Sequence, residues 1–207
     1  MTFDRRQALL LTIAGTFGTI FPRIATASAS PEDLIRALNA DLGSVARRAP
    51  NLTLADRLES VAGLLDRYFD LARVAAGTIG SRRFREFDRP QRSLFIDRFT
   101  RFMVASYVRR LPRFDAERTE VDAARSGPPG FSTVRVRYLA ADGADPAIID
   151  FVTIERDAAW RIVDVRMDGD FSEMAVRRSE VASVLESQGF DGLIDLLETR
   201  TEDLLSQ

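Results

Sequence analysis

The stretch that decides the fold of this chain is Trp160-Arg-Ile-Val-Asp-Val-Arg-Met-Asp-Gly169. Its apolar residues alternate with polar ones, which is typical of a β-strand. It leads through Arg177-Arg178-Ser179 to Gly189, which separates two helical patterns at about 172–187 and 191–205. We therefore interpret the stretch as the last strand of a sheet, followed by two closing helices.

Three further strands are expected before it, because apolar residues alternate and turn residues separate the segments. The four predicted strands cover about 116–124, 131–140, 147–156 and 159–168. Short turns at Asp142-Gly143 and Asp157-Ala158 make the later strands antiparallel neighbours. The strand at 147–156 is apolar on both faces, so the sheet needs cover on both sides. Helices supply one cover, and a buried apolar ligand is a candidate for part of the other.

The N-terminal half of the chain is predicted to be helical. Ser30-Pro31-Glu32-Asp33 combines a capping residue, a proline at the first helical position and acids in the first turn. Thr53, Asp70 and Ser81 are candidate starts of further helices, and Pro90 opens the longest one, which has a broad apolar face. The predicted fold class is α+β: several N-terminal helices, a curved antiparallel sheet of about four strands and two C-terminal helices.

Residues 1–29 have the three parts of an export signal. Arg5-Arg6 precedes an apolar run, and small residues follow it, with cleavage expected after Ala29 or, alternatively, after Ala27. The run is shorter than the roughly 20 residues of a membrane-spanning helix. The arginine pair also resembles a twin-arginine signal, so the ordinary secretory route and the twin-arginine route both stay open. We expect a soluble periplasmic protein in which residues 30–207 form a single domain.

The residue types that the chain lacks limit its chemistry. It contains no His and no Cys, which excludes Ser-His-Asp and Cys-His triads, disulfides, thiolate metal sites and a lipid anchor on cysteine. Gly127-Pro-Pro-Gly130 has neither the spacing nor the Lys of a phosphate-binding loop. The acids Asp164, Asp168 and Asp170 are better explained as a solvated face or as turn caps than as catalytic carboxylates. We expect no enzyme, no catalytic residue, no cofactor and no metal site; a lipid hydrolase is the weakest class considered.

The charge balance makes nucleic acid an unsuitable partner. The chain has 29 basic residues, all of them Arg, and 31 acidic residues, a formal net charge of −2. Removing the predicted signal takes away three arginines and one aspartate, which changes the net charge to −4. A domain of this charge does not attract bulk nucleic acid.

Several short motifs are spread over almost the whole mature chain: Tyr68-Phe69-Asp70 with Arg73, Gly80, Gln91-Arg92 with Phe95 and Phe99, Trp160 with Asp164-Val165, and Arg178-Ser179. In order and spacing they resemble the MlaC or toluene-tolerance family of periplasmic lipid-binding proteins. Two departures occur: Phe84 or Phe87 replaces the usual Trp, and one extra residue lies between Gly169 and Arg178. The segment 169–179 resembles the hopanoid-biosynthesis-associated branch, HpnM, more closely than the phospholipid branch.

The resemblance implies an apolar lipid cavity between the sheet and the helices. It also implies a shuttle that carries phospholipid or hopanoid between an inner-membrane lipid transporter and an outer-membrane lipoprotein complex, and we expect a monomer. The candidate lipid-binding residues are Phe69, Phe95, Phe99, Phe102, Met103, Tyr107, Tyr138, Phe151, Val163 and Val165. The candidate head-group residues are Arg73, Arg82 and Arg83.

Two alternatives stay open at this point. The candidate lining residues equally well fill an ordinary hydrophobic core. The chain also fits a non-carrying periplasmic interaction subunit of a membrane lipid-transport complex. Bound lipid separates the two functions, because a carrier released into water retains a cargo that has nowhere favourable to go.

Overall fold

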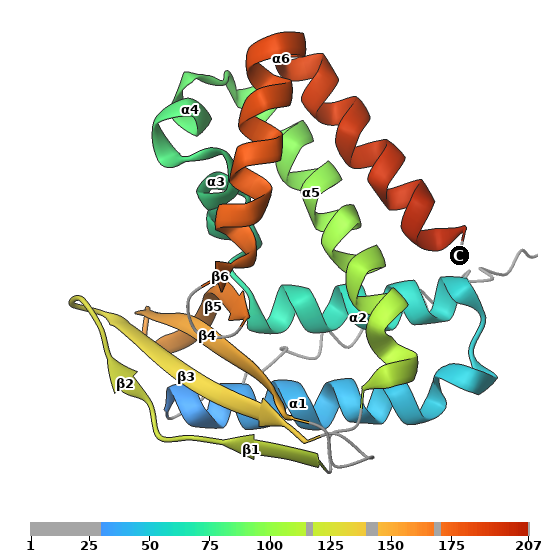
Figure 1. The fold of residues 1–207 in the computed structure, drawn as a ribbon, viewed down its shortest axis with the longest axis vertical. Helices are drawn as coiled ribbons and strands as arrows, with labels where there is room; N and C mark the ends of the chain where they lie inside the picture. Colours follow the sequence, from blue (N-terminus) through green and yellow to red (C-terminus); the bar gives the residue numbers. More distant parts are fainter. Residues whose placement is uncertain (1–29, 115–117, 140–144, 168–170, 207) are drawn as a thin grey trace, which may run out of the picture.

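The structure is a computed structural model that describes residues 30–114, 118–139, 145–167 and 171–206, with the side chains of Arg113, Met167 and 171–180 left aside. The predicted signal at 1–29 lies outside the described residues, as do the predicted turn at Asp142-Gly143 and the acids Asp168 and Asp170. Helices and one antiparallel sheet share the described part of the chain (Figure 1), so the predicted α+β class is confirmed.

The described residues contain six α-helices: α1 (Pro31–Arg48), α2 (Leu54–Tyr68), α3 (Leu71–Ile79), α4 (Ser81–Glu86), α5 (Arg89–Arg110) and α6 (Glu173–Leu205). Two short 3-10 helices, η1 (Ala49–Asn51) and η2 (Leu111–Arg113), follow α1 and α5. The sheet contains β1 (Thr119–Val121), β2 (Arg125–Ser126), β3 (Phe131–Tyr138), β4 (Ala147–Arg156), β5 (Ala159–Met167) and β6 (Phe171–Ser172).

Side-chain caps fix where the helices begin. The Ser30 hydroxyl accepts a hydrogen bond from the Asp33 amide at 3.1 Å, and Thr53 forms a reciprocal capping box with Asp56. These two predicted starts are confirmed. The long helix α5 begins one residue before Pro90, because Asp88 caps it through Gln91 and places Pro90 in the first turn. The two predicted C-terminal helices together make up α6. They meet at a kink at Gly189, whose φ of 70° lies in the left-handed region.

The strands are ordered β1-β3-β4-β5-β6, and β2 also pairs with β3. The hairpin between β4 and β5 turns at Asp157 and Ala158, which both have positive φ, as a two-residue turn of this kind requires. Of the predicted first strand, 116–124, the structure shows only β1 as a strand, 116–117 lie outside the described residues, and β2 begins just after the predicted range. The Ala124 amide donates to the Glu32 carboxylate at 2.7 Å, away from the ladder, and this bond to α1 separates β1 from β2.

A bulge in β5 decides which side chains share a face. Val152 pairs with Asp164 and Thr153 pairs with Ile162, so Val163 is an extra residue on β5. Strict alternation along the sequence would place Val163 on the same face as Val165. Because of the extra residue, Val163 and Val165 lie on opposite faces. Side chains on either side of the bulge share a face with their partners on β4, and the alternation along β5 is interrupted between them.

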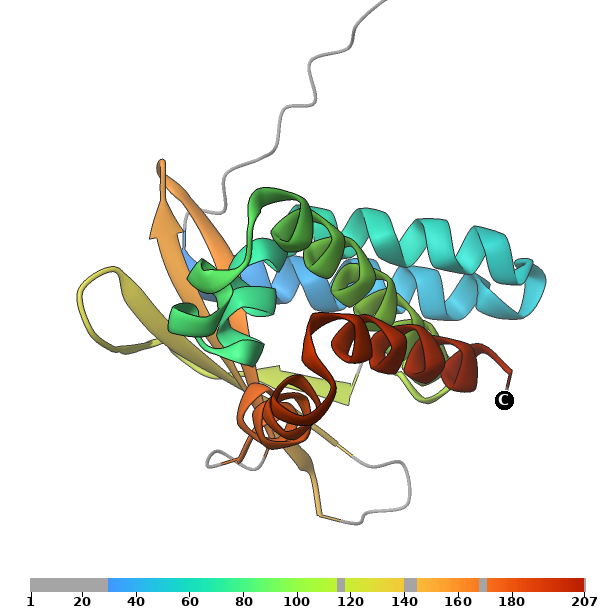
Figure 2. The ribbon, with the colours of Figure 1, turned by 90° about the horizontal axis from the view of Figure 1, so that it is seen from above.

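The helices α1, α2 and α5 lie together on one side of the sheet, which we call its inner face, and α6 packs beside α5 (Figures 1 and 2). The main core lies between them and contains Phe95, Phe99, Ile162 and Leu193, all buried to within 2 % exposure. A second, small cluster of Val152, Ile154 and Val163 with half-buried Phe131 lies on the outer face. The apolar residues on both faces of β4 therefore serve two separate clusters.

Candidate functional site

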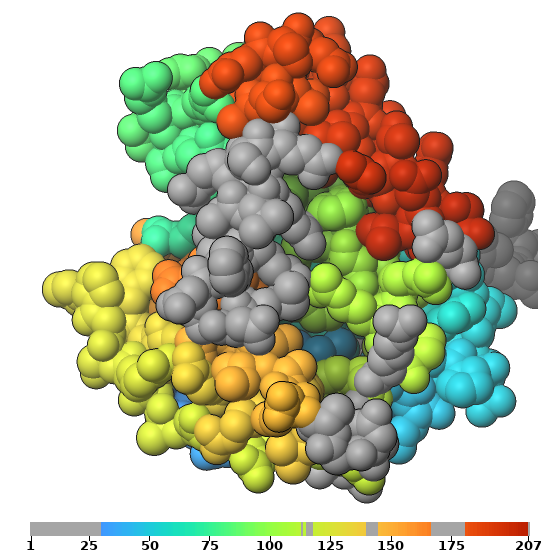
Figure 3. Space-filling model, viewed as in Figure 1, coloured from blue at the N-terminus to red at the C-terminus, as the bar shows by residue number. Residues whose placement is uncertain are grey.

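An apolar pocket of about 250 Å³ lies between the inner face of the sheet and the C-terminal end of α5; we call it the inner pocket. Leu42 of α1, Tyr107 and Arg110 of α5, Leu111 and Phe114 line its helical side. Its sheet side is lined by Tyr138, Leu139, Ala147, Ile149, Phe151 and Val165. Figure 3 shows the surface hollowed between β4 and α5 at this place.

Register and helix ends bring these residues together. Phe151 of β4 pairs with Val165 of β5, and Tyr138 of β3 pairs with Ala147 of β4, so their side chains share the inner face. The chain leaves α5 through η2, and this turn brings Phe114 next to Tyr138. Their ring centroids are 5.9 Å apart, in an edge-to-face contact. The pocket thus has aromatic side chains from a strand and from the segment after a helix.

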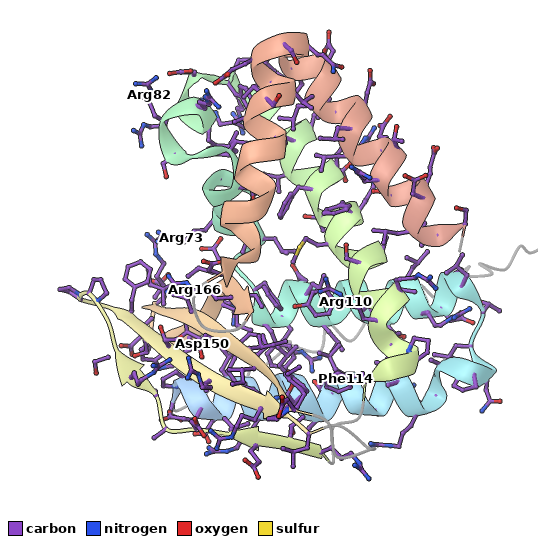
Figure 4. All side chains as sticks on the ribbon, viewed as in Figure 1. Arg73, Arg82, Arg110, Phe114, Asp150 and Arg166 are labelled. Atoms are coloured by element: carbon purple, nitrogen blue, oxygen red, sulfur yellow. The ribbon has the colours of Figure 1, made fainter. Side chains whose placement is uncertain are left out.

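The pocket has few polar groups. The Tyr138 hydroxyl donates to Asn39 Oδ1 at 2.9 Å. Burial raises the pKa of the Tyr138 hydroxyl above its ordinary value. The Asn39 side chain is 3 % exposed, and its Nδ2 has no hydrogen-bond partner among the described residues. Arg110, which is exposed, supplies a positive charge at the α5 side of the pocket (Figure 4).

Nine of the ten predicted lipid-binding residues belong to the main core on the inner side of the sheet. Four of them line the inner pocket: Tyr107, Tyr138, Phe151 and Val165. Phe69 lies behind Tyr107, with ring centroids 6.0 Å apart.

Phe95, Phe99, Phe102 and Met103 follow α5 away from the pocket. The rings of Phe95, Phe99 and Phe102 contact one another in sequence, with centroid separations of 6.0 and 6.5 Å. The structure therefore places these four side chains in packed core, and the inner pocket begins one helical turn after Met103.

Val163 is the one predicted lining residue that lies apart. It is 5 % exposed and belongs to the outer-face cluster with Val152 and Ile154. The bulge in β5 is the reason, because it turns Val163 away from the face that Val165 occupies.

The predicted head-group arginines also lie away from the inner pocket. Arg73 lines a cleft on the outer face, Arg82 pairs with Glu86 on α4, and Arg83 pairs with Glu186 of α6. Among the described residues, the arginine that lines the inner pocket is Arg110, which was not predicted from the sequence. Basic residues commonly end helices, so Arg109-Arg110 gives no signal of a site until the fold places Arg110 beside the sheet.

Within the described residues, no group of three or more His, Cys, Asp or Glu side chains could hold a metal ion. No helix in the same part of the chain is long and apolar enough to cross a membrane.

The fold and the pocket define a class of protein: an α+β domain with an apolar pocket between a twisted antiparallel sheet and its helices. The family model described as "MlaC protein" matches residues 41–199, so the chain belongs to the MlaC family. No curated protein matches the sequence. Among solved structures, the chain is similar to the phospholipid-binding protein from Ralstonia solanacearum in complex with a phospholipid, with a TM-score of 0.70 at 19% identity over 86% of this chain and 99% of that one.

Proposed function

We propose that this protein is a periplasmic lipid-binding shuttle and that the inner pocket receives the apolar part of its cargo. The observation that carries the proposal is an apolar, aromatic-lined pocket on the inner face of the sheet in a chain of the MlaC family. The phospholipid complex of the similar Ralstonia solanacearum protein supports lipid as the ligand class. Lack of His and Cys supports a binding role over catalysis.

The chemistry of the pocket suits acyl chains or a fused-ring body. Transfer of a chain from water into such a pocket is favourable by about 0.8 kcal/mol for each CH₂ group. Transfer from water into a bilayer is equally favourable, so the free-energy difference between lipid in the pocket and lipid in a membrane is small. The direction of lipid transport then depends on the partner membranes. We propose that an inner-membrane lipid transporter and an outer-membrane lipoprotein complex are these partners.

The inner pocket has to widen to hold a whole lipid. Its volume of about 250 Å³ lies below the roughly 300–1,000 Å³ of common small-molecule sites. The side chains able to provide room are the half-buried rings of Tyr107, Phe114 and Tyr138 at its border, because they are not enclosed on all sides. The packed rings of Phe95 and Phe99 along α5 are the deeper extension.

Arg110 is the proposed head-group contact. Its guanidinium is suited to bidentate contact with a phosphate at the border of an apolar pocket. We expect Arg110→Gln to weaken phospholipid binding by about tenfold, the effect of losing one charge-assisted contact. Arg109→Gln is the matched control, because Arg109 is the preceding exposed residue of α5 and does not line the pocket.

The arginine pair also separates the two candidate cargoes. A hopanoid without a phosphate would bind Arg110→Gln as well as it binds the unchanged protein, which would place the chain in the HpnM branch. Equal loss of phospholipid binding in Arg109→Gln and Arg110→Gln would contradict a specific head-group role.

The direct test is to purify residues 30–207 from a host that makes both phospholipids and hopanoids, extract the protein under denaturing conditions and identify lipid by mass spectrometry. We expect at least about one lipid for each chain, because cargo in the inner pocket has nowhere favourable to go in water, and none in a mock purification. A folded protein that is free of lipid and refuses added lipid would overturn the proposal.

A second candidate is a non-carrying interaction subunit of a membrane lipid-transport complex. The observation that favours it is the closed packing along α5, where Phe95 and Phe99 are at most 2 % exposed and contact other rings on both sides. The same lipid extraction separates the two candidates, because only the shuttle retains cargo.

A further inference from the structure

The outer face of the sheet carries a larger, more open cleft of about 910 Å³, which we call the outer cleft. Helices α3 and α4 form one wall, and strands β3, β4 and β5 form the floor. The wall on α3 contains small residues, Ala72, Ala76 and Gly77, which leave room above the strands. The outer cleft is separate from the inner pocket, because none of the described residues lines both.

Four arginines from four different elements line the outer cleft: Arg73 of α3, Arg85 of α4, Arg156 of β4 and Arg166 of β5. Among the described residues, only two acids, Asp70 and Asp164, line it with them, so this part of the lining carries a net formal charge of +2 in a chain whose total is −2. Figure 4 shows Arg73 and Arg166 close together on the sheet side of the molecule, far from Arg110.

The positive charge in the outer cleft is available to a ligand. Arg85 and Arg156 are exposed, and neither makes an ion pair with any residue in the described ranges. Arg73 contacts Asp70 at 3.6 Å, a long separation between two partly exposed side chains, and such a pair is worth little in water. Arg166 contacts the buried Asp164 at 3.5 Å, and its own side chain is 43% exposed, so part of it faces solvent.

The floor of the same cleft is apolar. Val152 and Val163 reach it from the outer-face cluster, and Phe131 and Phe84 are half-buried beside them. An apolar floor does not contribute to binding a free inorganic anion, and four arginines do not contribute to binding a neutral apolar molecule. The combination matches a molecule with one anionic group and one apolar group.

We propose that the outer cleft is a second binding site, for an anionic amphiphile. Its phosphate or carboxylate contacts the arginines, Arg85 and Arg156 foremost, and its apolar part lies against Phe84, Phe131, Val152 and Val163. This site does not depend on the cargo of the inner pocket.

The test is calorimetric titration of the purified protein at low salt with dihexanoyl phosphatidic acid, inorganic phosphate and dihexanoylglycerol in parallel. The matched variants are Arg85→Gln combined with Arg156→Gln, and Arg82→Gln as control. Arg82 lies on the same helix as Arg85, is 87% exposed and does not line the cleft (Figure 4). Circular dichroism checks that each variant is folded, which their surface position favours.

We expect saturable binding of the phosphatidic acid that weakens by at least about tenfold in the double variant and is unchanged in Arg82→Gln. A third variant, Val165→Trp, fills the inner pocket and should leave this binding intact. Four results would overturn the proposal: absence of saturable binding, equal affinity for inorganic phosphate, equal affinity for the neutral dihexanoylglycerol, or loss of binding in Val165→Trp with retention in the double variant.

Discussion

The two faces of one sheet are stabilised in different ways. On the inner face, Val134, Phe151 and Ile162 are buried against the helices and form one continuous core. On the outer face, Asp150 is held by Arg135 and Arg125, with a small apolar cluster beside it. The same strands supply both arrangements, because successive side chains point to opposite faces. An apolar run on a strand therefore does not by itself identify the face that receives a ligand.

The largest expected difference between the two faces is in core packing. Phe99→Ala removes a ring that is 2 % exposed and contacts Phe95 and Phe102, and we expect it to lower the free energy of unfolding by about 3–5 kcal/mol. Phe131→Ala, in the half-buried outer cluster, should cost about half as much. Urea denaturation measures both. Equal losses would contradict the distinction between a continuous inner core and a satellite cluster.

The next effect is electrostatic and belongs to the outer face. Asp150 accepts hydrogen bonds from Arg135 at 2.7 and 2.9 Å and from Arg125 at 3.0 Å, and its side chain is 4% exposed. Asp150→Asn should lower the free energy of unfolding by about 1–3 kcal/mol, because both arginines are partly solvated and lose only part of their stabilisation. An unchanged urea midpoint would show that the ion pairs contribute nothing.

The same substitution changes the response to acid. Burial by itself raises the pKa of the Asp150 carboxyl, and the hydrogen bonds and charges of Arg135 and Arg125 more than reverse this, so its pKa lies below the ordinary value. The stabilisation is therefore present above the unfolded-state pKa of about 4 and is lost as the pH falls through the folded-state pKa. Urea midpoints between pH 7 and pH 2 should fall more steeply for the unchanged protein than for Asp150→Asn.

A smaller effect belongs to the inner pocket. Tyr138→Phe leaves Asn39 without its hydrogen bond to Tyr138 and should cost about 1–2 kcal/mol near neutral pH. The raised pKa of Tyr138 favours the protonated hydroxyl in the folded state, so its contribution is present below the unfolded-state pKa of about 10 and is lost as the pH rises beyond it. The difference between the two proteins should thus shrink in alkaline urea titrations. A constant difference from pH 7 to pH 12 would contradict this role.

The smallest effect is expected at the hairpin that joins β4 to β5. Ala158 has a φ of 58°, which suits glycine better than alanine. Ala158→Gly should raise the free energy of unfolding by about 0.5–1 kcal/mol and change ligand binding on neither face. Thermal denaturation measures the gain, and a loss of stability would show that the turn is not strained.

The sequence predicted the main elements well, because their signals are local. The caps at Ser30 and Thr53, the strand at 147–156 and the break at Gly189 depend on residues within a few positions of each other. The side of the sheet on which Val163 lies could not be predicted. The bulge in β5 depends on how β5 pairs with β4, and the alternation of apolar and polar residues along β5 does not indicate it.

The lining of the inner pocket was predicted in part for the same reason. Four predicted residues line it, because apolar periodicity indicates an inward face: Tyr107, Tyr138, Phe151 and Val165. Arg110, Phe114 and Leu139 were missed, because they reach the inner pocket only where a helix end and a strand end meet in three dimensions. Arg73, a predicted head-group residue, lines the outer cleft and not the inner pocket, and its sequence motif does not indicate the face of the sheet.

The most direct test of the central claim is a comparison of two positions on β5. Val165→Trp fills the inner pocket, and Arg161→Trp adds the same side chain to the outer face at a position that lines neither the inner pocket nor the outer cleft. Lipid extracted from each folded variant is measured by mass spectrometry for each mole of protein. We expect a several-fold loss of lipid in Val165→Trp and none in Arg161→Trp. Lipid retained in Val165→Trp and lost in Arg161→Trp would contradict the role of the inner pocket.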